Sequence, residues 1–78
     1  MHFKQYNVSV TGNVTYLSEK HERVLIPKVE CEVIEETLMG PFLIFWREDG
    51  MQKQASLSLQ DWGFYQGQNA FRDAHQGL

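Results

Sequence analysis

The first part of the chain alternates apolar and polar residues, a pattern that predicts β-strands. Residues 6–16 are YNVSVTGNVTY, and apolar side chains occupy every second position except at Gly12. A period of two is typical of a strand with one buried face. A two-residue hairpin loop at Gly12 and Asn13 would mix polar and apolar side chains on both faces. We therefore expect one long strand over residues 6–16, with a bulge or bend at Gly12.

A second strand is predicted over residues 24–36, VLIPKVECEVIEE, after a polar turn at residues 17–23. Val29, Cys31 and Val33 would share the buried face, and the charged residues between them would face solvent. Pro27 has no amide hydrogen, so it belongs at a sheet edge or a bulge. Cys31 is expected to be a small buried hydrophobe rather than a nucleophile.

Residues 41–59 contain the strongest hairpin signal, because Asp49 and Gly50 suit a two-residue type I′ turn. This loop would pair Trp46 with Lys53, Ile44 with Ala55 and Phe42 with Leu57 on one face, and Arg47 with Gln52, Phe45 with Gln54 and Leu43 with Ser56 on the other. Since the first strand of this hairpin is apolar on both faces, it is expected to be central in the sheet. A further element must then cover Leu43 and Phe45.

A C-terminal helix is expected to provide that cover. Ser58 can cap it, and Asp61 would lie favourably in its first turn. Trp62, Phe64, Tyr65 and Phe71 would form its apolar stripe. If the helix instead covers the opposite face, an apolar patch is left open for a partner or a second copy. We therefore predict a single α+β domain over residues 1–78, a small antiparallel sheet of about four strands in the order ββββα with the helix packed on it.

Charged residues are distributed unevenly along the chain, and this distribution indicates which class of partner the protein binds. The chain has 78 residues and a formal net charge of −3, but residues 29–49 hold six acids and one base. An acidic middle repels nucleic acid and membrane surfaces and attracts basic protein surfaces. The sequence has no run of the ~20 apolar residues that cross a bilayer. MHFKQYNVSV lacks the apolar core of a signal peptide, and the single cysteine forms no internal disulfide, so we expect a cytoplasmic location.

The acidic stretch does not match a metal site. Glu30 and Glu32 would lie ~7 Å apart on one strand face. Calcium needs about six or more oxygen ligands from a shaped loop, which this sequence lacks. The three histidines are spread without metal-ligand spacing, and no nucleophile or nucleotide-binding motif is present. We expect no enzyme activity, cofactor or metal, and the carboxylates form either a solvated face or a protein-docking patch.

These features predict a non-catalytic protein-binding module that docks on a basic surface of another protein, as phage or mobile-element inhibitors of host complexes do. Its partner-binding residues would be Glu30, Glu32, Glu35 and Glu36 for electrostatic steering, and Phe45, Arg47 and Trp62 as anchors. Aromatic and arginine side chains are the usual anchors of protein interfaces. The alternative is a homodimeric scaffold that pairs through the edge near Pro27 or through an uncovered apolar face. A nucleic-acid-binding sheet is a third and less favoured hypothesis.

Overall fold

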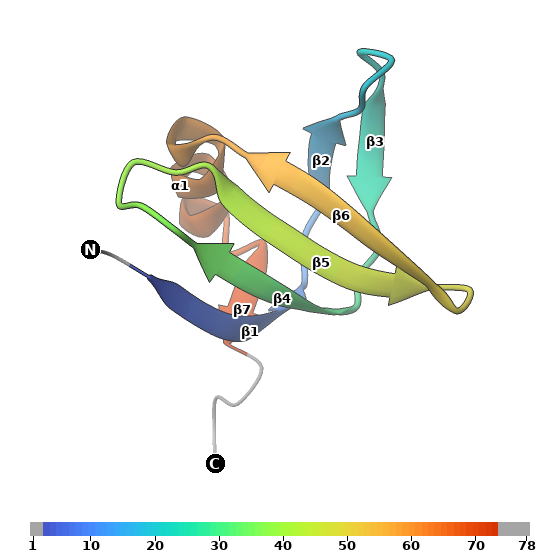
Figure 1. Ribbon diagram of the computed structural model, residues 1–78, viewed down its shortest axis with the longest axis horizontal. Helices are drawn as coiled ribbons and strands as arrows, with labels where there is room; N and C mark the ends of the chain where they lie inside the picture. The colour runs from blue at the N-terminus through green and yellow to red at the C-terminus, as the bar shows by residue number, and fades with distance from the viewer. Residues whose placement is uncertain (1–2, 74–78) are drawn as a thin grey trace.

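The computed structural model describes residues 3–73, which form seven strands and one helix (Figure 1). The elements are β1 (Lys4–Val10), β2 (Val14–Leu17), β3 (Arg23–Ile26), β4 (Glu30–Glu35), β5 (Phe42–Glu48), β6 (Met51–Leu57), α1 (Leu59–Gly67) and β7 (Phe71–Asp73). Five antiparallel strands form the main sheet in the order β6-β5-β4-β1-β7, and β2 and β3 form a separate ribbon. The α+β class is confirmed, whereas the expectation of about four strands is wrong.

The core lies on one face of the main sheet, between that face, α1 and the ribbon. Its buried side chains from the main sheet are Val8, Val10, Cys31, Val33, Phe42, Ile44, Trp46, Ala55, Leu57 and Phe71. Trp62 of α1 stacks against both Phe42 and Phe71, with ring centroids 4.9 and 4.6 Å away. Tyr16 of the ribbon meets Trp46 edge-on at 6.0 Å. The helix and the ribbon therefore seal the same side of the sheet.

The β5–β6 hairpin has the predicted register throughout. Phe42 pairs with Leu57, Leu43 with Ser56, Ile44 with Ala55, Phe45 with Gln54, Trp46 with Lys53 and Arg47 with Gln52. Asp49 and Gly50 have φ angles of 53° and 77°, as a type I′ turn requires. β5 lies inside the sheet between β4 and β6, so its predicted central position is also confirmed.

The helix begins at the predicted residue but ends at Gly67, before the predicted apolar stripe reaches Phe71. The side chain of Ser58 accepts a hydrogen bond from the backbone N–H of Asp61 at 3.1 Å. Asn69 has a φ of 57°, and this left-handed residue turns the chain from the end of the helix into β7. Phe71 therefore lies in a strand, which corrects its assignment to the helical stripe.

Within residues 3–73, no helix is long and apolar enough to cross a membrane.

The predicted long strand over residues 6–16 is wrong, because the chain leaves the main sheet at Gly12. Thr11 and Gly12 both donate their backbone N–H to the carbonyl oxygen of Ala70, at 2.7 and 3.2 Å. A Cβ atom at Gly12 would lie only 2.9 Å from that of Ala70. The close approach of a segment far along the sequence therefore directs the chain from β1 into the ribbon.

The predicted strand over residues 24–36 is also divided, at Pro27. Residues before the proline form β3 of the ribbon, and those after it form β4 of the main sheet. Val29 donates its N–H to the carbonyl of Pro27 at 2.9 Å, which bends the chain between the two strands. Cys31 and Val33 are buried as predicted, but Val29 is 37% exposed, so its expected inward orientation is wrong.

Candidate docking site on the open face of the sheet

The helix α1 and the ribbon pack on the core face of the main sheet, and the side chains of the opposite face are half-buried or exposed. Successive side chains of a strand point to opposite faces, so each strand with a core residue also contributes a residue here. The central row of this open face is Asn7, Glu32, Phe45 and Gln54, which are neighbours across β1, β4, β5 and β6. The helix covers the Phe42 side, and the expectation that it covers Leu43 and Phe45 is therefore wrong.

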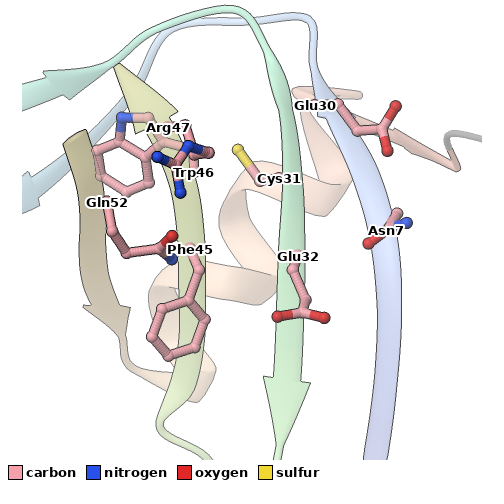
Figure 2. Close-up of a pocket in the computed structure, with 8 residues that line it drawn as sticks. All are labelled: Asn7, Glu30, Cys31, Glu32, Phe45, Trp46, Arg47 and Gln52. Carbon is pink, nitrogen blue, oxygen red and sulfur yellow. The ribbon is translucent and has the colours of Figure 1, made fainter. Parts of the chain in front are cut away.

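A hollow of about 380 Å³ lies on this open face and gathers four of the seven predicted site residues. Glu30, Glu32, Phe45 and Arg47 line it together with Asn7, Cys31, Trp46 and Gln52. Figure 2 shows Phe45 and Arg47 on β5, with Glu30 and Glu32 on the neighbouring strand β4. The hollow therefore combines two carboxylates, one guanidinium and one half-buried aromatic ring.

Hydrogen bonds orient two of these charged side chains. The side-chain amide of Gln5 donates to a carboxylate oxygen of Glu32. The guanidinium of Arg47 donates to the carbonyl oxygen of Gly50 at 2.9 Å, which holds it towards the hairpin turn. Glu30 and Arg47 are exposed, whereas Glu32 is half-buried beside Phe45. The site therefore combines one positive and two negative side chains with the apolar surface of Phe45.

The other two predicted carboxylates lie elsewhere, so the four acids do not form one patch. Glu35 is on the core side of β4, where the hydroxyl of Tyr6 donates to its carboxylate. Burial of the phenol, and then the hydrogen bond to Glu35, raise the pKa of Tyr6. Glu36 follows the end of β4 and is exposed. Neither residue lines the hollow that contains Glu30 and Glu32.

Trp62 is not available to a partner, which corrects its assignment as an anchor. Its side chain is only 8% exposed and lies in the aromatic stack of the core. A ring in this position stabilises the attachment of α1 to the sheet. Phe45 is the aromatic residue among the predicted anchors that remains on an open surface.

The remaining candidate groups are the cysteine and the histidines. Burial, and to a smaller extent the charge of Glu30, raise the pKa of the Cys31 thiol to about 11. A neutral buried thiol is a poor nucleophile. His21 occupies a turn, and His2 and His75 lie outside the described residues. Over residues 3–73, no three His, Cys, Asp or Glu side chains are grouped so that they could hold a metal ion.

Asn7 and Gln52 line the hollow, although neither was predicted as a site residue. The alternation in residues 6–10 does place Asn7 on the polar face of its strand. Its position beside Glu32 depends on the pairing of β1 with β4, and the ribbon separates these strands in the sequence.

Comparison of the chain with protein-family models, curated proteins and solved structures finds no match.

Proposed function

We propose that the protein is a non-catalytic binding module that docks on a basic surface of another protein through the open face of its main sheet. The observation that carries this proposal is the hollow on that face, where Phe45 lies beside two carboxylates and Arg47. Interface centres are enriched in aromatic and arginine side chains surrounded by polar groups. An inhibitor of a larger protein complex is one form that such a module could take.

The charges support a basic partner. Residues 29–49 carry six acids and one base, and Glu30 and Glu32 bring two of these acids to the open face. A negative surface attracts a positive partner during encounter and orients it for docking. A lysine or arginine placed over Phe45 would gain about 0.5–2 kcal/mol from the ring and could pair with Glu32. Arg47 would in turn favour an acidic group on the same partner.

Affinity capture tests this proposal. Tagged protein is incubated with lysate of the source cell or its host, and bound proteins are identified by mass spectrometry. The variant Glu30→Lys/Glu32→Lys reverses both negative charges of the hollow and should lose a stoichiometric partner. The variant Glu22→Lys/Glu36→Lys makes the same change in net charge at two exposed residues outside the hollow and should retain it.

The comparison of the two variants decides between local and general electrostatics. Equal loss in both would show that binding follows net charge rather than the open face. Undiminished binding in Glu30→Lys/Glu32→Lys would make the carboxylates ordinary solvated surface. Both outcomes would contradict the proposed docking site.

A further inference from the structure

The outer edge of β6 is an unpaired strand edge. Within residues 3–73, β5 is the only strand that pairs with β6. Glu48 and Met51 flank the two-residue loop and form a hydrogen-bonded pair, and such pairs recur at every second residue of an antiparallel ladder. Gln52, Gln54 and Ser56 therefore direct their backbone N–H and C=O groups away from β5, and all three residues are exposed.

A second hollow, of about 330 Å³, lies along this edge. One wall is formed by residues 16–19, at the end of β2 and the turn after it, and the other by residues 54–56 of β6 with Leu43 and Phe45 of β5. Glu19 supplies a negative charge to the first wall, while Lys53 is the only charged residue of β6. The edge therefore borders an open hollow at residues 54–56, and the far wall of this hollow carries a charge opposite to that of β6 itself.

We infer that β6 pairs antiparallel with β6 of a second copy of this chain, with Gln54 opposite the partner's Gln54 on a two-fold axis. This register places Gln52 opposite the partner's Ser56, and the reverse. The three residues with outward backbone groups are centred on Gln54. A two-fold axis at that residue therefore lets every outward N–H and C=O group of the edge form a hydrogen bond.

Charge complementarity favours a second copy as the occupant. In this register Lys53 lies opposite the partner's Ala55, and Ala55 and Glu19 line the same hollow in each copy. Each lysine would therefore lie beside the partner's Glu19, and the symmetry forms this ion pair twice. The axis also keeps the two lysines from lying directly opposite each other, where like charges would repel.

The dimer would have one continuous sheet of ten strands with two docking sites. A two-fold axis perpendicular to the sheet leaves both open faces on the same side. The dimer itself does not depend on the proposed function, but a bivalent docking surface does. Two linked sites bind a repetitive or dimeric partner more tightly than either site alone.

Sedimentation velocity over a range of protein concentrations tests the pairing. Wild-type protein should show a concentration-dependent dimer. Gln54→Pro removes an N–H that β5 does not use and should raise the dimer dissociation constant by about tenfold or more. Gln54→Thr keeps this N–H and should dimerise like the wild type, and circular dichroism shows whether each variant is folded.

A charge swap tests the register. Glu19→Lys and Lys53→Glu should each weaken the dimer by about fivefold, and the double variant Glu19→Lys/Lys53→Glu should restore it. Glu30→Lys/Glu32→Lys should leave the dimer unchanged, which separates failure of the docking site from failure of the edge.

Three outcomes would overturn the pairing. The first is a monomer at every concentration up to about 1 mM. The second is a dimer unaffected by Gln54→Pro, which would use another surface. The third is a monomer that captures a different protein, loses it on Gln54→Pro and keeps it on Gln54→Thr, which would assign the edge to a partner's strand.

Discussion

The two faces of the main sheet are built from the same strands but differ in what covers them. On β5, Ile44 is fully buried beneath the helix and ribbon, whereas its neighbours Leu43 and Phe45 are half-buried on the open face. The apolar run in this strand therefore does not indicate burial on both faces. It combines a core face with a second apolar face that no element of residues 3–73 covers.

This difference separates the residues that hold the fold from those available for binding. Core side chains contribute to stability through their complete removal from water. Half-buried side chains on the open face gain less from folding, and a partner can bury the remainder. Substitutions on the two faces should therefore divide into effects on stability and effects on binding.

The largest effect should come from shortening a core side chain. Ile44→Ala should lower the free energy of unfolding by about 2–5 kcal/mol, because it leaves a cavity in the sealed side of the sheet. Leu43→Ala, one position away on the open face, should lower it by about 1 kcal/mol or less. Urea denaturation of both variants measures the difference, and equal losses would mean that both faces are covered.

The next effect should come from the point where the chain crosses into the ribbon. Gly12→Ala should cost about 1–3 kcal/mol, because the new Cβ would lie 2.9 Å from Ala70 Cβ and 3.0 Å from Ala70 Cα. Gly63→Ala is a matched control, since a Cβ there meets nothing within 4 Å. It should stabilise the helix by up to about 1 kcal/mol. Thermal unfolding of both variants gives the result, and a tolerated alanine at Gly12 would contradict this packing.

The alkylation rate of the Cys31 thiol measures how well the core face of the sheet is shielded from solvent. At pH 8 its alkylation in the folded protein should be about two orders of magnitude slower than in the urea-unfolded chain, because folding raises the thiol pKa to about 11. The chain has one cysteine, so labelling reports this site alone. Labelling as fast as in the unfolded chain would contradict the burial of the thiol in the core.

The same shift gives stability a defined pH dependence. The folded pKa of Cys31 is raised above its unfolded value, so folding favours the neutral thiol. Its contribution is fully present below the unfolded pKa and is lost as the pH rises through about 11. A decrease in stability on the alkaline side that disappears in Cys31→Ala would confirm this.

The smallest effect on stability should come from the acidic residues of the open face. Glu30→Lys/Glu32→Lys should change the free energy of unfolding by only about 0.5 kcal/mol, because the side chains are not in the core. The same variant should lose the captured partner. A large loss of stability would instead assign these carboxylates a structural role.

Turn and helix-capping preferences correctly predicted the parts of the fold that depend on residues close together in the sequence. The Asp49-Gly50 turn determined the register of β5 and β6, and Ser58 determined the start of the helix. At Gly12 and Pro27 only a bulge or bend was expected, whereas the strand ends at each of them. At Gly12 a distant contact decides this. The carbonyl of Ala70 accepts two bonds at the first break, and no periodic signal in residues 6–16 reveals that partner.

The site was predictable to a similar extent. Alternation predicted that Glu30 and Glu32 share one face of their strand, and that Phe45 and Arg47 share one face of theirs. The hollow that joins the two pairs depends on the register between β4 and β5, which was not predicted. The same alternation separates Glu35 from this group, since it shares the parity of the buried Val33. Trp62 was misassigned as an anchor although its place in the apolar stripe of the helix already indicated burial against the sheet.

The central claim is that the open sheet face, rather than exposed apolar surface in general, docks the partner. It is tested most directly by affinity capture with Phe45→Ala beside Phe64→Ala, since Phe64 is 60% exposed on the helix, away from the hollow. Truncating an interface anchor costs about 2 kcal/mol or more, or roughly 30-fold in affinity. We predict that Phe45→Ala loses the partner and Phe64→Ala retains it. Retention by Phe45→Ala, or loss by Phe64→Ala alone, would contradict the account.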